Sequence, residues 1–402
     1  MSFILIAVLI DMVAIGLIVP VLPYMVGQFT EGADAQARWF AIVTFTFGAA
    51  NFVAAPVLGA LSDRFGRRPV LLIGFTGLAL SFFVTGLATA LWMLVAVRVL
   101  SGAMQANAAI ANAYVADIST PEQRAARMGQ IGAMFGIGFI LGPVAGGLLG
   151  DIDVRLPFFV AGTLAVLNGL YGYFVLPESL PPDRRRPFAW RSAHPLAAVQ
   201  TLARNPGIGW LAAAIALATL AQFAMHSSWV LYTHFRFGWG PAEVGWSLFT
   251  VGLMSALVQG VLLRHLLKRF SPRRLAAWGL SVGALTYAAF GTVTEGWMMY
   301  VVIVVGTLLG GGAQAALQSI VSNAADAQRQ GEVMGAVASV NSLMAVLAPA
   351  TAGPLLVLIS HRSPDDWLIG LPFYASALLQ AVAALIAIRF FTARRTAEAQ
   401  PA

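Results

Sequence analysis

The chain has 402 residues, of which 59% are hydrophobic and 10% are charged, and its formal net charge at pH 7 is +7. This much apolar surface exceeds what a soluble core of this size can bury, so we expect an integral membrane protein. The absence of cysteine excludes disulfides, thiolate metal sites and cysteine nucleophiles.

Twelve apolar runs follow one another along the chain, each long enough to cross a hydrocarbon core of about 30 Å. They cover residues 3–25, 38–61, 70–89, 91–116, 128–149, 156–176, 207–232, 242–263, 275–293, 297–322, 333–358 and 367–390. The first run lacks a cationic leader and a cleavage site, so it is expected to be retained. The expected fold class is an all-α membrane protein with twelve transmembrane helices in two six-helix repeats.

Most of the 24 Lys and Arg residues fall between the runs on one side of the membrane. The expected outer segments hold only Arg38, Arg155, Arg236 and Arg362, and Arg98 is the only cation in the interior of an expected span. This positive-inside bias predicts that both termini are cytoplasmic. The basic charge therefore indicates topology, and no nucleic-acid partner is expected.

A polar stretch with the sequence P-P-D-R-R-R-P separates the first six runs from the last six. We expect an N-terminal bundle over 1–176, a cytoplasmic linker over 177–206, a C-terminal bundle over 207–391 and a cytoplasmic tail over 392–402. The segment D-R-F-G-R-R is echoed by K-R-F-S-P-R-R, and L-W-M by G-W-M, at the same offset. Two short matches can arise by chance, but they favour a duplicated transporter with its substrate site between the halves.

The decapeptide Gly59–Arg68, G-A-L-S-D-R-F-G-R-R, joins the second and third runs. Glycines permit a tight turn there, and Asp63 can pair with an arginine or a helix N-terminus to form a latch that breaks when the halves rock. Ordinary positive-inside charge is the alternative. The helix rise places Asp117, at the end of the fourth run, on the same cytoplasmic side.

A second motif lies in the fifth run, where Gly138–Gly147 reads G-F-I-L-G-P-V-A-G-G. Glycines four residues apart give a smooth face that another helix can approach, and Pro143 is expected to kink the helix. Glycine-rich packing without a further function is the alternative interpretation.

Asp11 lies roughly 12 Å into the first run, where a charged carboxylate costs about 2.5 to 3.5 kcal/mol. We expect it to be protonated for part of the time and to carry a proton inward; a hydrogen-bonded structural Asp is the alternative. Arg98, Gln105 and Asn112 recur every seven residues and predict a polar stripe facing a central cavity. Arg98 would there tune Asp11 or contact substrate, unless it only binds carbonyl groups.

Further polar, aromatic or polarizable side chains within the runs are candidates for binding substrate, although amides also hold helices together. The candidates are Asn51, Gln105, Gln222, Met225, His226, Trp229, Gln259, Gln314, Gln318 and Asn341. His226 is also a secondary candidate for carrying protons.

The decapeptide resembles the loop signature of the major facilitator superfamily, G-x-L-a-D-R-x-G-R-[RK]. That resemblance implies a gating latch formed by Gly59, Asp63, Arg64, Gly66, Arg67 and Arg68, with Asp117 as the acid that pairs with the loop arginines. The fifth run resembles the antiporter signature G-x-x-x-G-P-x-x-G-G, which implies export. The residues that match it are Gly138, Gly142, Pro143, Gly146 and Gly147.

Within that superfamily, the chain most resembles the proton-coupled tetracycline efflux antiporters. The resemblance covers essentially the whole chain, is carried by the segments 11–23, 91–94, 98–102, 229–248 and 294–297, and is weakest in the linker. It fails at Ser81 and Gly283, near which those antiporters carry membrane carboxylates, and at Ser255, where they carry a histidine. Proton coupling would then depend on fewer groups, and the substrate need not be a tetracycline.

The resemblance implies an antiporter of the bacterial inner membrane that exchanges inward protons for an outward amphipathic drug by alternating access. No cofactor is expected, because the proton gradient supplies the energy, and a tetracycline would bring its own magnesium. The expected partners are the drug, protons and the bilayer, and the expected state is a monomer. An exporter or symporter of another metabolite and a non-transporting receptor are alternatives. No H-E-x-x-H metal-ligand motif is present, and no enzyme is expected.

Overall fold

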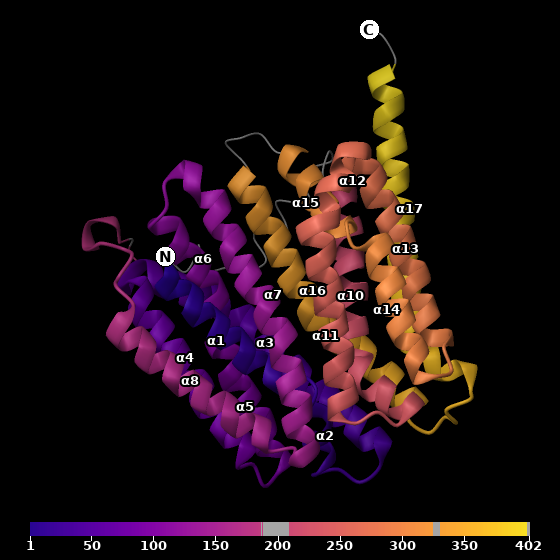
Figure 1. Cartoon of the computed structure of the whole chain (residues 1–402), viewed down its shortest axis with the longest axis horizontal. Coiled ribbons are helices and arrows are strands. Elements are labelled where there is room, and N and C mark those ends of the chain that lie inside the picture. The colour runs from indigo at the N-terminus through magenta and orange to yellow at the C-terminus, as the bar shows by residue number, and fades with distance from the viewer. Residues whose placement is uncertain (186, 188–208, 325–329, 400–402) are drawn as a thin grey trace. The chain divides into compact units, whose positions relative to one another are not determined.

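The structure, a computed structural model, describes residues 1–185, 187, 209–324 and 330–399. These residues form helices and connecting segments without a strand (Figure 1). Among them, 11 helices or helix pairs are long and apolar enough to cross a membrane, and a shorter apolar helix lies at Ser2–Ile18. The all-α membrane fold predicted from the twelve apolar runs is confirmed.

The chain divides into two compact units. Unit 1 comprises Met1–His194 and Trp239–Gly252, and unit 2 comprises Pro195–Gly238 and Leu253–Ala402. A short segment from the second half of the sequence therefore groups with the first half.

Unit 1 is a bundle in which α1 lies against α7 and α8, α3 against α5, and α4 against α8 (Figure 1). Its elements are α1 (Ser2–Ile18), α2 (Leu22–Gly27), α3 (Ala33–Phe65), α4 (Arg67–Gly86), α5 (Leu91–Met104), α6 (Asn107–Asp117), α7 (Pro121–Ile152), α8 (Leu156–Val175), η1 (Pro182–Arg184) and the first part of α11 (Pro241–Leu257).

The beginning of α11 is held within unit 1 by two polar contacts. The Tyr24 hydroxyl donates to the carbonyl oxygen of Trp239 at 2.6 Å, and the Ala242 N–H donates to Asp151 Oδ1 at 3.2 Å. Glycines of α7 provide the space, because a Cβ at Gly147 would overlap the carbonyl oxygen of Pro241.

Three expected spans are interrupted, the run 297–322 among them at Gly311 and Gly312, which corrects the sequence-based prediction. The run 3–25 is divided between α1 and α2 at Val19–Val21, because Pro20 has no N–H to continue the ladder. The run 91–116 is divided at Gln105 and Ala106. Asn51 Nδ2, from α3, donates to the carbonyl oxygens of Gly102 and Gln105 at 3.3 and 3.4 Å, and so satisfies groups that a helix end leaves unpaired.

The break between α5 and α6 also corrects the predicted polar stripe. Arg98 belongs to α5 and Asn112 to α6, and Gln105 lies at the break with φ −82° and ψ 24°. A seven-residue spacing places side chains on one face only along a continuous helix. The three residues therefore do not form a stripe on a single α-helix.

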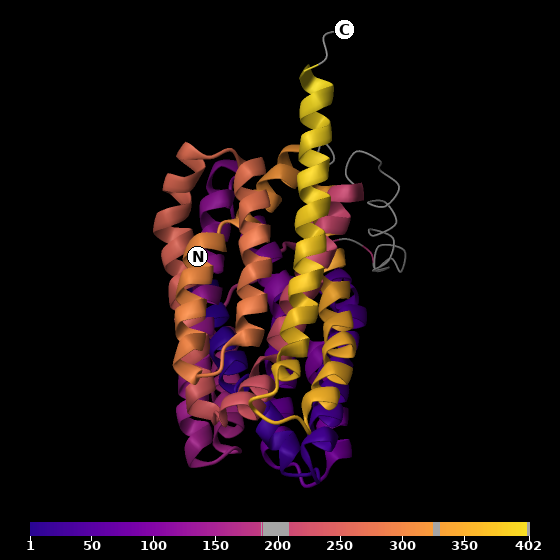
Figure 2. The same cartoon turned by 90° about the vertical axis from the view of Figure 1, so that its right-hand side faces the viewer.

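Unit 2 is built around α10, which lies against α16 and α17, and α13 also lies against α17. Figure 2 shows α17 as one long yellow helix. The elements are α10 (Gly209–Phe237), the end of α11, η3 (Val258–Leu262), α12 (Leu263–Arg269), α13 (Pro272–Thr292), α14 (Gly296–Gly310), α15 (Ala313–Ala324), α16 (Gln330–Ile359), η4 (Trp367–Gly370) and α17 (Leu371–Ala399).

Helix α10 continues past the expected end of its span at residue 232 and includes Arg236 in its last turn. The buried Arg236 side chain donates from Nε to the carbonyl oxygen of Val293 at 3.2 Å and from Nη1 to that of Asp366 at 3.0 Å. The sequence placed Arg98 alone within a span and Arg236 in an outer segment. The structure shows that Arg236 is also a buried cation of a helix.

Candidate functional site

The first part of the candidate site is a buried acid on α1. Asp11 is 4% exposed, and Asn107 Nδ2 on α6 donates to its Oδ1 at 3.3 Å and its Oδ2 at 3.5 Å. A small cavity of about 10 Å³, close to the space that one water molecule needs, borders both residues. Its other lining residues are apolar or small: Ile4, Val8, Met12, Leu71, Phe75, Ala108, Ala111 and Phe135.

Arg98 is also buried, at 5% exposure, on α5. Its guanidinium carbon lies 5.9 Å from the centre of the Phe47 ring, a cation–π arrangement. Within the described residues, Arg98 forms no ion pair with a carboxylate, and the side chain that contacts the Asp11 carboxylate is Asn107. The direct contact between Arg98 and Asp11 that the sequence left open is not formed.

Asn107 was not among the residues selected from the sequence. Its position carried a usable signal, because Asn107 and Asp11 each lie about ten residues from the cytoplasmic end of their spans and so at similar depth. The seven-residue spacing from Arg98 drew attention to Gln105 and Asn112 instead.

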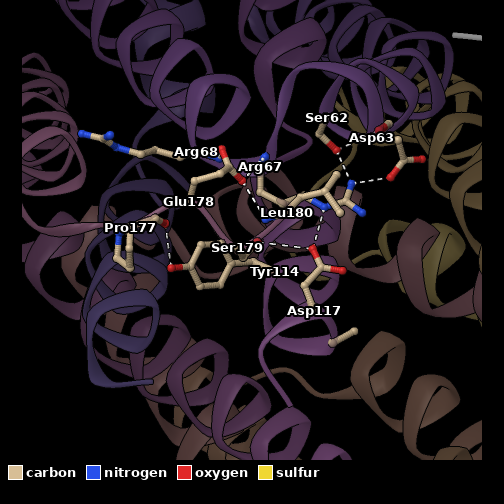
Figure 3. A network of polar contacts seen from close by, with 12 residues as sticks. Ser62, Asp63, Arg67, Arg68, Tyr114, Asp117, Pro177, Glu178, Ser179 and Leu180 are labelled. Carbon is tan, nitrogen blue, oxygen red and sulfur yellow. Dashed lines mark hydrogen bonds and ion pairs between the residues drawn. The ribbon is translucent and has the colours of Figure 1, made fainter. Parts of the chain in front are cut away.

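The second part of the candidate site is the junction of α3 and α4, which Figure 3 shows in detail. The Arg67 guanidinium pairs with Asp63 Oδ1 at 2.6 Å and with Asp117 Oδ2 at 3.0 Å, and it donates to Ser62 Oγ at 2.6 Å. Arg67 is 8% exposed, whereas the Asp63 side chain is 44% exposed. One guanidinium therefore joins α3, α4 and the end of α6, and the structure brings Asp117 to the loop arginines as predicted.

Glu178, just after α8, completes this junction and was also missed. Its carboxylate accepts hydrogen bonds from the main-chain N–H groups of Arg67 at 2.8 Å and Arg68 at 3.2 Å (Figure 3). Unpaired N–H groups and the helix dipole both favour an anion at the N-terminus of α4. Gly66 has φ +107°, and a Cβ there would overlap the Glu178 carboxylate. The sequence did carry a signal for Glu178, because this acid directly follows the sixth expected span on the cytoplasmic side, where the loop arginines also lie.

Four residues of the predicted latch lie outside this ion-pair network. Arg68 donates to the carbonyl oxygen of Tyr173, and the Arg64 guanidinium carbon lies 5.0 Å from the centre of the Phe65 ring. A Cβ at Gly59 would meet no atom within 4 Å, so Gly59 marks no close helix approach among the described residues. The turn depends on Gly66 instead, whose positive φ favours glycine.

The glycines of the α7 motif form the predicted smooth face against α1. A Cβ at Gly142 would lie 2.7 Å from Gly16 Cα, and a Cβ at Gly146 would overlap the carbonyl oxygen of Leu17. A Cβ at Gly138 would overlap the Met12 side chain. Pro143 lies within α7, which continues through it as one helix. The expected close approach of another helix is confirmed.

Some of the substrate candidates have packing contacts. Trp229 is buried, and its ring centre lies 5.1 Å from that of Phe290 and 6.0 Å from that of Phe373, so it belongs to an aromatic cluster. The Asn341 side chain accepts a hydrogen bond from Thr219 Oγ1 at 3.0 Å.

The remaining candidates differ in exposure. Met225 is buried, and Gln105 and Gln222 are half-buried. The exposed candidates are His226, Gln259, Gln314 and Gln318. Ser81, near the expected place of an acid, is buried and donates to the carbonyl oxygen of Gly77 at 2.7 Å.

Membrane-spanning helices, a buried acid and a junction held by ion pairs define the protein as a membrane transporter. The chain belongs to the Major Facilitator Superfamily, whose sequence profile matches residues 4–349 and 236–402.

Two relatives and one solved structure are similar along nearly the whole chain. Identity is 36% to the tetracycline resistance protein of class D from Salmonella ordonez, over 95% of each chain. It is 34% to the class C protein from Escherichia coli, over 93% of each chain. The human organic anion transporter MFSD10 has the same fold, with a TM-score of 0.70 and 22% identity over 96% of this chain and 98% of that one.

Proposed function

We propose that this transporter is a proton-coupled antiporter that exports an amphipathic drug from the cytoplasm across a bacterial inner membrane, with tetracyclines as the first substrate class. The observation that carries the proposal is the buried Asp11, whose hydrogen-bond partner is the neutral Asn107. The names of the similar proteins from Salmonella ordonez and Escherichia coli support tetracycline as the substrate.

Asp11 is suited to carrying a proton because burial without a cationic partner disfavours the charged carboxylate, so the protonated form can be populated. In the proposed cycle, Asp11 binds a proton from outside and releases it inside as the central site alternates between the two faces. Arg98 tunes this exchange, and the Arg67 junction closes the cytoplasmic side. Each inward proton supplies about 2.3 kcal/mol per 100 mV, so no cofactor is needed, and a tetracycline would bring its own magnesium.

The proposed protein acts as a monomer with both termini in the cytoplasm. The bias of Lys and Arg toward one set of loops supports this orientation.

A second candidate substrate class is a different amphipathic drug or metabolite. Ser81, Gly283 and Ser255 favour it, because they stand where the tetracycline efflux antiporters are expected to carry two acids and a histidine. The direction of flux distinguishes an antiporter from a symporter of the same fold.

The proposal is tested by flux into everted membrane vesicles, in which the cytoplasmic face of the protein is outside. Acidifying the lumen should drive tetracycline into the lumen as protons leave, and a protonophore should stop the uptake. Asp11→Asn should abolish this gradient-driven uptake while the protein is still produced in the membrane.

Asp365→Asn is the matched control, because Asp365 is an exposed acid in the segment between α16 and η4, and it should keep full uptake. Uptake by Asp11→Asn at the wild-type rate would contradict the role of Asp11. Movement of drug in the same direction as the protons would identify a symporter.

A further inference from the structure

We propose that Asn107 is a positioning residue for the proton on Asp11. Its amide donates to the Asp11 carboxylate when that group is ionised, and after a half-turn it accepts from the Asp11 hydroxyl when that group is protonated. This inference deepens the proposed function and rests on it.

The first observation is the contact itself. A single NH₂ group, Asn107 Nδ2, lies 3.3 Å from Oδ1 and 3.5 Å from Oδ2 of Asp11, and both side chains are at least 96% buried. An ionised carboxylate only accepts hydrogen bonds, whereas a carboxylic acid has an O–H that needs an acceptor. An amide carries a donor and an acceptor on the same planar group, so it can serve both states.

The second observation is that the other end of the amide has no partner. Asn107 Oδ1 is buried and accepts no hydrogen bond. Buried polar atoms without partners are rare and destabilising, so a rotation that gives this oxygen a hydrogen-bond donor lowers the free energy. Turning the amide brings Oδ1 to the Asp11 hydroxyl and places Nδ2 where Oδ1 was.

The third observation is the space at that end. The Oδ1 atom occupies the place where a side chain on Gly74 would begin, because a Cβ at Gly74 would overlap it. The carbonyl oxygen of Met104 lies 3.3 Å from the same Cβ position. After the half-turn, Nδ2 therefore faces a region that contains a carbonyl acceptor. Glycine at position 74 makes both orientations possible.

Among the described residues that line the adjoining cavity, Asp11 is the one ionisable group. Helices α6, α7 and α8 pack against α1, and α4 packs against α6 and lines the same cavity. The ionisable side chains of these four helices lie outside that lining. These are Arg67, Arg68, Tyr114, Asp117, Glu122, Arg124, Arg127, Asp151, Tyr171 and Tyr173.

The experiment measures Asp11 protonation directly, without transport. Dicyclohexylcarbodiimide reacts with protonated carboxyl groups in apolar surroundings, so the full-length protein in liposomes is labelled across a pH series and the label on Asp11 is quantified by mass spectrometry. Asn107→Leu keeps the size of the side chain but removes both polar atoms. Because a hydrogen bond to an ionised group is stronger than one to a neutral group, the pH of half-labelling should rise by about one unit.

Asn107→Ser is the rescue variant, since a hydroxyl group also donates and accepts. It should label with a midpoint closer to that of the wild type than to that of Asn107→Leu. A role in packing alone would give the opposite order, because Leu fills the site better than Ser. An unchanged midpoint in a folded Asn107→Leu protein would overturn the inference.

Gly74→Ala tests the same arrangement without changing a polar group. It replaces Asn107→Leu as the test variant if Asn107→Leu does not fold. Its Cβ would displace the Asn107 amide, so the midpoint should also rise. Gly136→Ala on α7 is the matched control, because a Cβ there meets no atom within 4 Å, and its midpoint should equal that of the wild type. Equal midpoints in both alanine variants would contradict the proposal.

The two proposals fail separately. Full uptake by Asp11→Asn would reject the proposed function whatever the labelling shows. An inactive Asp11→Asn together with an unshifted Asn107→Leu midpoint would leave the proposed function intact and reject only the role of Asn107.

Discussion

At the scale of single residues, the junction of α3 and α4 depends on one guanidinium with acceptors of unequal burial. The side chain of Asp117 is 21% exposed and that of Asp63 is 44% exposed, and both pair with Arg67. Water and salt screen the more exposed pair, so it contributes less. The pair of Arg67 with Asp117, which joins α4 to α6, is therefore stronger than its pair with Asp63, which joins α4 to α3.

We predict that Asp117→Asn lowers the maximal rate of export more than Asp63→Asn does, by about tenfold against a few-fold, with little change in KM. The reason is that, in the proposed cycle, the junction opens and closes without contacting the drug. Initial rates of uptake at a series of drug concentrations measure both parameters. Asp183→Asn, an exposed acid in η1, should behave as the wild type. Maximal rates equal to wild type in both variants would remove the latch from the mechanism.

At the scale of helices, the closest packing in unit 1 is the glycine face of α7 on α1. Gly142 and Gly146 leave room for the backbone of Gly16 and Leu17. Such an approach lets helices in lipid gain van der Waals contact where no hydrophobic force acts between them.

We predict that Gly146→Ala destabilises the protein, because its Cβ would overlap a backbone oxygen that cannot move without shifting α1. Overpacking of this kind costs about 1 to 3 kcal/mol, so the midpoint of thermal unfolding in detergent should fall by roughly 1 to 4 °C. Gly136→Ala, with open space around its Cβ, should leave the midpoint unchanged. Equal midpoints in the two variants would show that this contact does not limit stability.

Hydropathy predicted the helices well, because the length and apolarity of a span are properties of local sequence. It did not predict the break at Gln105, since the carbonyl groups freed there are satisfied by Asn51 from another helix. It also placed Arg236 outside α10, although the carbonyl oxygens of Val293 and Asp366 hold that side chain. Each failure involves a hydrogen-bond partner distant in sequence.

At the candidate site, too, features set by local sequence were predicted and those set by contacts between helices were missed. The sequence identified Asp11 from its depth, and Asp117 and Arg67 from helix rise and motif, and the structure brings the last two together. Asn107 and Glu178 were missed because each acts on a group contributed by another helix. Partners of this kind follow from tertiary packing, which a single sequence does not display.

At the scale of the whole molecule, the orientation in the membrane can be tested because the chain has no cysteine. We predict that a membrane-impermeant maleimide labels Ser363→Cys in intact cells but labels Arg184→Cys only after permeabilisation. Both positions are exposed, so access is decided by the side of the membrane. The parent protein should stay unlabelled, and the reverse pattern would invert the proposed topology.

The segment Trp239–Gly252, held in unit 1 by Tyr24 and Asp151, limits how far the two halves of the chain are independent. A fragment that ended in the linker would lack this segment, and the space that Gly147 leaves for Pro241 would lose its occupant. One stretch of the second half thus completes the packing of the first. If the halves arose by duplication, the first has come to depend on the second.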